Sequence, residues 1–201
     1  MDTIYQPHED SFLMQEVLRK LVFEKKVKLG RVLDIGTGTG ILAFEIAKMA
    51  KHIDAVDINP SALDFVKKKI KELAFNNIDV FYSDLFTNIK HKYDLIIFNP
   101  PYLPASEELD VYNLHKLDII GGKTGSEIIC KFLKQAKNFL TQNGKILFCC
   151  SSLGNTKAIE NELKQGYDYE VLARKKLFFE ELFVYLAKPK HEENRKSGTS
   201  C

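Results

Sequence analysis

The chain has 201 residues, 45% of them apolar, and a formal net charge of +2. This length and apolar content predict a single globular domain with its own core. So small a net charge gives no electrostatic reason to expect a dedicated nucleic-acid-binding protein. Arg19 and Lys20 interrupt the apolar stretch at 17–23, so we expect no membrane span.

The cysteines and histidines give no sign of a disulfide framework or a metal site. Cys130, Cys149, Cys150 and Cys201 lack the spacings of either, and the five histidines are scattered. The first residues also lack the pattern of a secretory signal. We therefore expect a cytoplasmic, reduced protein that holds no metal of its own and does not associate with membranes.

The N-terminal segment combines a polar run with a helix. Apolar residues recur at helical spacing from Phe12 to Val22, which predicts a helix ending near Lys25 with Asp10 or Ser11 as its N-cap. The simplest interpretation is a helix that covers one face of a sheet. The polar run at 5–11 can in addition line a pocket.

A glycine-rich loop follows the first predicted strand, Val32–Ile35. The order strand, Gly36-Thr37-Gly38-Thr39-Gly40, helix is typical of loops that bind nucleotide-like ligands, because glycines let the backbone turn tightly beside a ligand. The spacing differs from the Gly-x-Gly-x-x-Gly of dinucleotide sites. Asp34, just before the turn, suits a ligand with a cationic ammonium group better than one with a pyrophosphate.

An acidic residue ends the second predicted strand, His52–Asp57. Asp57 lies about 20 residues after the glycine loop, where an acid can bind ribose hydroxyls. It can instead be a capping or turn residue. The next helix is predicted to begin at Asn59-Pro60-Ser61.

A further acid, Asp84, follows the third predicted strand, Ile78–Tyr82. Its carboxylate can accept a hydrogen bond from an adenine amine, and we expect Leu85 and Phe86 to lie against the ring. A lone acid at a strand end is usually a turn residue. Three acids at successive strand ends favour a ligand site.

The strand Leu95–Phe98 is an unbroken apolar run, which predicts burial on both faces. It leads into Asn99-Pro100-Pro101-Tyr102, where the prolines stiffen an extended chain. The Asn99 side chain and the Pro100 carbonyl are then expected at the carboxyl end of the strand, where open α/β sheets bind ligands. Together they suit a planar –NH2 group, held by its two hydrogens and stacked on Tyr102. On its own, the motif is equally typical of a proline-rich turn.

The rest of the chain predicts two helices and three strands. The segment 103–123 lacks periodicity and is expected to face a substrate. The predicted elements are a helix with apolar positions from Ile128 to Leu140 that stops at Asn143-Gly144, a strand Lys145–Cys150, a helix Ala158–Lys164 and a hairpin of strands Tyr169–Arg174 and Leu182–Ala187. We expect 191–201 to be a disordered tail.

These motifs together resemble the class I S-adenosylmethionine-dependent methyltransferases over nearly the whole chain. The glycine loop and Asp57 are similar to that family's cofactor loop and ribose-binding acid. Asn99-Pro100-Pro101-Tyr102 resembles the signature of enzymes that methylate planar nitrogens of adenine, cytosine or glutamine. Segments 5–12 and 121–125 resemble the HemK-like branch, specifically its short eukaryotic and archaeal members, which methylate the glutamine of the Gly-Gly-Gln motif in class 1 release factors.

The resemblance implies an α/β fold: a single Rossmann-like methyltransferase domain over 1–190, with 1–28 as an N-terminal segment and helix packed on it. Its sheet is expected to be seven-stranded and mostly parallel, with an antiparallel C-terminal hairpin strand and helices on both faces. The cofactor-binding residues are predicted to be Ser11, Asp34, Gly36, Gly38, Asp57, Ile58, Asp84, Leu85 and Asn99. Catalysis is assigned to Asn99, Pro100 and Tyr102, and substrate binding to these three and Pro101.

The resemblance also implies partners. A class 1 release factor is the expected protein substrate, and short relatives are paired with a small zinc-binding activator that covers an apolar sheet edge. Because this chain lacks a zinc site of its own, the zinc is expected in that partner of the heterodimer.

Two other interpretations remain. One is an adenine N6 methyltransferase acting on DNA or RNA through the same Asn99 motif, although the near-neutral charge argues against nucleic acid as a direct substrate. The other is a non-catalytic scaffold subunit, against which the complete set of acids and the intact motif argue.

Overall fold

The computed structural model describes residues 4–105 and 119–190. The predicted tail at 191–201 and most of the predicted substrate-facing segment lie outside these residues. The elements, in chain order, are α1 (Glu9–Phe23), β1 (Arg31–Ile35), α2 (Ile41–Ile46), β2 (His52–Asp57), α3 (Pro60–Leu73), β3 (Ile78–Tyr82), β4 (Tyr93–Phe98), α6 (Glu127–Ala136), the 3-10 turn η1 (Lys137–Phe139), β5 (Leu140–Ser151), α7 (Thr156–Gly166), β6 (Tyr167–Lys176) and β7 (Glu181–Pro189).

The strands form one seven-stranded sheet in the order β3-β2-β1-β4-β5-β7-β6. Neighbours from β3 to β5 run parallel, and β7 is antiparallel to both β5 and β6. The prediction of a mostly parallel sheet with an antiparallel C-terminal hairpin strand is confirmed. The strand order reverses between β1 and β4, so the connections that leave their adjacent carboxyl ends run to opposite faces of the sheet, at the point where such sheets bind ligands.

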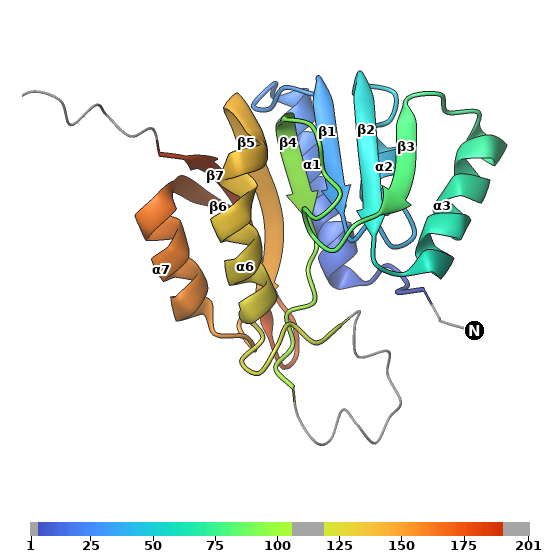
Figure 1. Cartoon of the computed structure of the whole chain (residues 1–201). Coiled ribbons are helices and arrows are strands. Elements are labelled where there is room, and N and C mark those ends of the chain that lie inside the picture. The colour runs from blue at the N-terminus through green and yellow to red at the C-terminus, as the bar shows by residue number, and fades with distance from the viewer. Residues whose placement is uncertain (1–3, 106–118, 191–201) are drawn as a thin grey trace, which may run out of the picture.

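Helices cover both faces of the sheet, with α6 and α7 on one side and α1 and α2 on the other (Figure 1). The core is correspondingly split into two apolar clusters. In β4, Ile96 and Phe98 belong to the cluster under α6 and α7, whereas Leu95 and Ile97 belong to the cluster under α1 and α2. All four are buried, which confirms the prediction from the continuous apolar run. Within the described residues, no helix has the length and apolar character that crossing a membrane requires.

The predicted N-cap of the first helix is wrong. Helix α1 begins at Glu9 with His8 as its N-cap, and the Phe12 N–H donates to the His8 carbonyl at 3.0 Å. Asp10 and Ser11 therefore lie inside the first helical turn, and both are buried. Their side chains bond to groups elsewhere in the fold, so they do not cap the helix.

The predicted end of the helix after Gly125 is also wrong. Helix α6 ends at Ala136, and Asn143-Gly144 lies inside the long strand β5. Leu140 pairs with Tyr93 and Lys145 with Leu95, so β5 bulges between these pairs. A Cβ at Gly144 would lie 2.6 Å from the Tyr93 carbonyl oxygen. The glycine is therefore required by the close approach of two strands, and it does not end a helix.

Candidate active site

A cavity of about 820 Å³ opens at the carboxyl ends of the parallel strands. Every residue that the sequence assigned to cofactor, substrate or catalysis lines it: Ser11, Asp34, Gly36, Gly38, Asp57, Ile58, Asp84, Leu85, Asn99, Pro100, Pro101 and Tyr102. The fold thus brings together residues from five separate segments between Ser11 and Tyr102. Their roles toward a ligand remain predictions.

The glycine loop forms the floor between β1 and α2. Gly36, Gly38 and Gly40 have φ angles of +62°, +54° and +79°, values that residues with a Cβ rarely adopt. The loop is tied to β2, because the Thr37 N–H donates to the Val56 carbonyl at 3.0 Å. A backbone of this shape leaves room for a ligand to approach closely.

Asp57 is held by the backbone at the end of β2. One carboxylate oxygen accepts from the Gly38 N–H at 2.9 Å, and the other accepts from the Asn59 N–H at 2.9 Å. Burial raises its pKa above the ordinary value for an aspartate. A carboxylate has about four acceptor sites, so Asp57 can still accept a hydrogen bond from a ligand hydroxyl in the cavity.

Asp34 is almost completely buried at the end of β1. The Thr37 hydroxyl donates to it at 2.7 Å. Burial raises the pKa of Asp34 to about 7, while the hydrogen bond from Thr37 opposes that rise. A cationic group bound nearby would favour its ionised form.

Asp84 and Leu85 reach the cavity from the loop after β3. The Lys131 ammonium of α6 lies 3.6 Å from an Asp84 carboxylate oxygen, and this carboxylate is half-exposed. The prediction that Phe86 lies against a ligand ring is not met. Phe86 is buried in the core under α6, where it stacks on Phe132 and Phe139.

Asn99 has a fixed orientation at the end of β4. Its amide nitrogen donates to a carboxylate oxygen of Asp10 at 2.8 Å and to the Ser11 hydroxyl at 3.3 Å. Since a carboxylate accepts and does not donate, this assigns the amide nitrogen to the Asp10 side. Among the described residues, the Asn99 side-chain oxygen is the only buried side-chain nitrogen or oxygen without a hydrogen-bond partner. Such an atom is an acceptor ready for a ligand donor.

Two tyrosines border the Asn99–Asp10 pair. The Tyr5 hydroxyl donates to Asp10 at 3.0 Å, so the Asp10 carboxylate accepts hydrogen bonds from both Tyr5 and Asn99. Burial, reinforced by the nearby Asp10 charge, raises the pKa values of both Tyr5 and Tyr102 above the ordinary tyrosine value. Both phenols are therefore neutral at physiological pH, and Tyr102 offers the cavity an aromatic ring, not a base.

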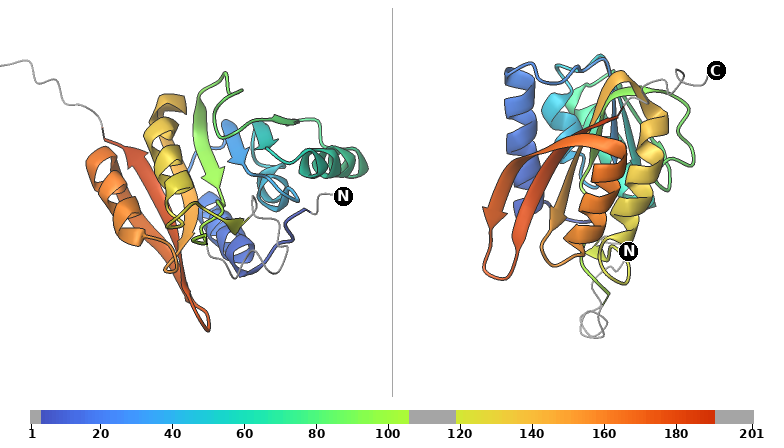
Figure 2. Two further views of the ribbon diagram at one scale, coloured as in Figure 1. Left: turned by 60° about the horizontal axis from the view of Figure 1, so that its bottom comes forward. Right: turned by 90° about the vertical axis from the view of Figure 1, so that its left-hand side faces the viewer.

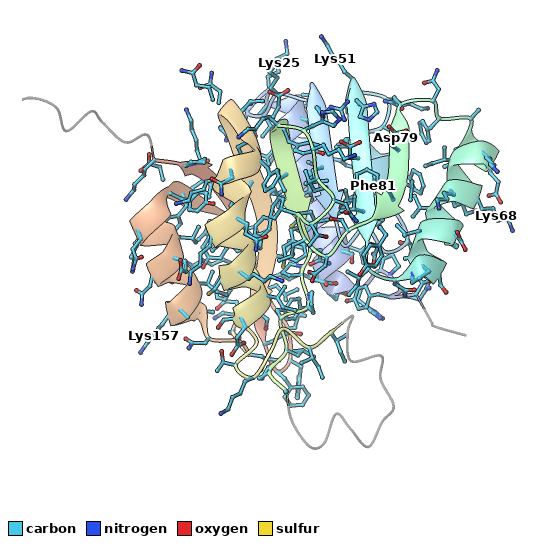
Figure 3. The ribbon with its side chains drawn as sticks, in the orientation of Figure 1. Lys25, Lys51, Lys68, Asp79, Phe81 and Lys157 are labelled. Carbon is cyan, nitrogen blue, oxygen red and sulfur yellow. The ribbon has the colours of Figure 1, made fainter. Side chains whose placement is uncertain are left out.

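Most of the charged side chains that line the cavity are acidic. Among the described residues, one lysine, Lys131, and six carboxyl side chains line it; the latter are Glu9, Asp10, Asp34, Asp57, Asp84 and Glu180. Lys25 and Lys51 project from the opposite end of the sheet (Figure 3). A cavity whose charged groups are mainly acidic favours a ligand with positive charge. Together with the acceptors of Asp57, the residues present fit a cationic ligand that carries hydroxyl groups.

Some lining residues were not predicted from the sequence as site residues. Tyr5 and Asp10 were included only in a polar run that could line a pocket, and Lys131 and Glu180 were not considered. Glu180 accepts a hydrogen bond from the Ser151 hydroxyl and comes from the β6–β7 turn. Nothing in the local sequence of a helix or turn indicates that it meets a strand end formed far away in the chain.

The sequence matches the model of a family described as the methyltransferase small domain, over residues 11–116. This range holds β1 to β4 and every predicted site residue. The match therefore covers the glycine loop, the acids at the strand ends and the Asn99 motif in one stretch.

Three similar proteins agree with this match. A Methanocaldococcus jannaschii protein, provisionally named protein N5-glutamine methyltransferase, is 43% identical over 183 residues, covering 90% of this chain and 89% of its own. A release factor glutamine methyltransferase of Streptococcus pneumoniae is 36% identical over 57% of this chain and 43% of its own.

The third is a chain from the structure of the E. cuniculi Mtq2–Trm112 complex, described as responsible for methylation of the eRF1 translation termination factor. It superimposes with a TM-score of 0.70 at 23% identity, covering 93% of this chain and 99% of that one. At this identity the likeness shows the fold. From the family match and the identity to the M. jannaschii protein, the chain belongs to the methyltransferase small domain family and is a HemK-like class I methyltransferase.

Proposed function

We propose that the protein is an S-adenosylmethionine-dependent N-methyltransferase that methylates the side-chain amide of a protein glutamine. The substrate we propose is the Gly-Gly-Gln motif of a class 1 translation release factor. This follows the names of its relatives, which include a protein N5-glutamine methyltransferase and a release factor glutamine methyltransferase. It also agrees with the chemistry of the cavity.

The observation that carries the proposal is the unpaired side-chain oxygen of Asn99. Asp10 and Ser11 take up the amide nitrogen, so the oxygen remains to accept one N–H of a substrate –NH2 group. Pro100 lines the same cavity, and its carbonyl is assigned the second N–H. Two acceptors fixed by a stiff Asn-Pro-Pro segment can orient a planar amide before reaction.

The residues of the glycine loop and the strand ends are assigned to the cofactor. Asp57 would accept from the ribose hydroxyls, Asp84 would accept from the adenine amine, and Asp34 would stabilise the positive charge. Ser11, Gly36, Gly38, Ile58 and Leu85 line the remaining surface. When bound, S-adenosylmethionine supplies an electrophilic methyl group on a sulfonium.

The residues of this chain act on the nucleophile. An amide nitrogen is weakly nucleophilic because its lone pair is delocalised into the carbonyl. Hydrogen bonds from both its N–H groups to Asn99 and Pro100 would favour a pyramidal nitrogen whose lone pair points at the methyl carbon. The rate gain then comes from orientation and electrostatics. Tyr102 stacks against the amide plane, and because it is a neutral phenol, the released proton passes to water.

A small partner subunit also belongs to the proposal. One structural relative is described as a complex of two proteins, and β3 forms one edge of the sheet here. Tyr82 on this strand is 51% exposed. An open strand edge beside exposed apolar groups suits a partner that covers it. Any zinc would be held by that partner.

The test is a transfer assay with radiolabelled S-adenosylmethionine. The purified chain is offered a class 1 release factor and, separately, duplex DNA and RNA, each with and without a small zinc-binding partner. We expect label on the release factor that is lost when the glutamine of its Gly-Gly-Gln motif is replaced. Label on nucleic acid alone would refute the glutamine assignment and favour the adenine enzyme.

The Asn99→Ala variant separates catalysis from cofactor binding. We expect it to keep most of its binding of S-adenosylmethionine, since the glycine loop and the acids at the strand ends remain, and to transfer no methyl group, because the acceptor for the amide is gone. Undiminished transfer would refute the mechanism. A wild-type chain that binds no S-adenosylmethionine would instead support a scaffold role.

A further inference from the structure

The turn between β6 and β7 carries two exposed aromatic side chains. Phe178 is 91% exposed and Phe179 is 84% exposed. Their rings meet edge to face with centroids 4.6 Å apart. Single exposed apolar residues are common, but two adjacent phenylalanines presented together form a patch of the kind that marks an interaction site.

The turn holds the two rings away from the core. The Leu177 N–H donates to the Glu180 carbonyl at 2.8 Å, and Lys176 pairs with Glu181 at the end of the two strands. Phe178 and Phe179 are therefore the two central residues of a closed turn. The hairpin that carries them projects from the body of the molecule (Figure 2). A patch on a closed turn loses little conformational freedom when it binds a partner.

The same turn forms part of the wall of the active-site cavity. Leu177 and Glu180, which flank the two phenylalanines, both line the cavity. The hairpin is fixed against the N-terminal end of α1 by the ion pair of Lys175 with Glu9, and Glu9 also lines the cavity. A chain that enters the cavity from this side therefore passes the phenylalanine pair.

We propose that Phe178 and Phe179 form a docking anchor for an apolar patch on the folded body of the protein substrate, next to the segment whose glutamine enters the cavity. This inference rests on the proposed function and adds how the enzyme recognises a whole protein. The charges around the pair favour this occupant over a nucleic acid or an anionic membrane. Lys175 and Lys176 precede the pair, Glu180 and Glu181 follow it, and their formal charges cancel, so recognition there is apolar.

The test compares a whole protein with a short peptide as substrate for the double variant Phe178→Ala/Phe179→Ala. The substrates are a full-length class 1 release factor and a peptide containing only its Gly-Gly-Gln segment. We expect KM for the factor to rise at least tenfold with kcat nearly unchanged, and the kinetics with the peptide to stay within twofold of wild type. If the turn has only a structural role, the kinetics with both substrates should change to the same extent.

A matched control is Phe23→Ala, because Phe23 is 89% exposed and lies at the other end of α1. It should leave both KM values unchanged. Equal thermal stability and equal S-adenosylmethionine affinity establish that the double variant is folded.

An unchanged KM for the factor in the double variant would overturn the anchor while leaving the proposed function standing. Wild-type chain that labels neither factor nor peptide would refute the proposed function, and the anchor with it. If the wild-type chain sediments as a dimer and the double variant as a monomer, the two phenylalanines belong to a self-association surface, and the proposal is also overturned.

Discussion

The side-chain amide of Asn99 donates to the carboxylate of Asp10 at 2.8 Å, across 89 positions of the sequence. This contact joins the end of β4 to the first turn of α1. It decides which way the Asn99 amide faces, and so leaves the side-chain oxygen as the acceptor in the cavity. Asp10 is in turn bonded by the Tyr5 hydroxyl. Asp10 is thus a positioning residue for the atom that we assign to the substrate amide.

Replacing Asp10 should therefore slow transfer without weakening cofactor binding. In Asp10→Ala, the Asn99 amide loses a charge-assisted hydrogen bond of about 1.5–3 kcal/mol and can rotate. We expect kcat to fall by about 10- to 100-fold, while the affinity for S-adenosylmethionine measured by calorimetry stays within twofold. Ser11→Ala removes the longer Asn99 contact at 3.3 Å and the 3.4 Å hydrogen bond from the Ser11 hydroxyl to Asp10, but it leaves the charge-assisted bond between Asn99 and Asp10 and should cost less. An equal loss of cofactor affinity in Asp10→Ala would contradict the positioning role.

Removing the Asp57 carboxylate should weaken cofactor binding. Asp57→Ala loses the acceptor that we assign to the ribose hydroxyls, and hydrogen bonds to a charged group contribute about 1.5–3 kcal/mol. We expect the dissociation constant of S-adenosylmethionine to rise by about 10- to 100-fold in equilibrium titration. The control is Asp79→Ala, since Asp79 lies on β3, away from the residues that line the cavity (Figure 3). Unchanged affinity in Asp57→Ala would refute the assignment.

The ligand-free protein should lose stability as the pH rises toward neutrality, because of Asp34. Its pKa is about 7 in the fold against an ordinary value of 3.8. Between these values the folded chain holds a proton that the unfolded chain has released, so the free energy of unfolding falls as pH rises and levels off above the folded pKa. The slope from this one group reaches about 1.4 kcal/mol per pH unit.

Urea denaturation of the wild-type chain and Asp34→Asn at pH values from about 4 to 8 measures this effect. Asparagine cannot ionise, so the stability of the variant relative to wild type should increase across this window. Parallel pH profiles for the two chains would show that Asp34 is not protonated in the fold.

Tyr93 should matter for stability and not for activity. Its hydroxyl donates to Asp54 at 2.7 Å, and Arg31 donates to the same carboxylate at 2.7 Å. Tyr93 and Asp54 are buried, and neither lines the cavity. Tyr93→Phe removes a buried donor, so the free energy of unfolding should drop by about 1–3 kcal/mol while kcat and KM remain unchanged. The exposed Tyr82→Phe is the control, with no change in stability. A loss of activity in folded Tyr93→Phe would contradict the assignment of the Tyr93–Asp54 hydrogen bond to stability alone.

The sequence by itself determined most elements of the fold. Strand β2 was predicted with its observed bounds, and α3 begins within the predicted Asn59-Pro60-Ser61, because the signals for a strand and for a helix start act within a few residues of one another. The order glycine loop, acid, acid, Asn-Pro-Pro-Tyr also placed the predicted site residues other than Ser11 at or just after the carboxyl ends of parallel strands, and these ends meet in one cavity.

The tertiary structure decided what depends on distant partners. Asp10 or Ser11 was predicted as an N-cap, but His8 is the N-cap, and the Asp10 carboxylate accepts hydrogen bonds from Asn99 and Tyr5. Phe86 was expected beside a ligand, but it packs in the core on Phe132. Asn143-Gly144 was predicted to end a helix, but pairing with β4 makes it part of β5. In each case the local pattern permits more than one structure. Which structure forms is decided by a hydrogen bond, an aromatic ring or a strand from another part of the chain. These partners come into place only once the sheet has formed.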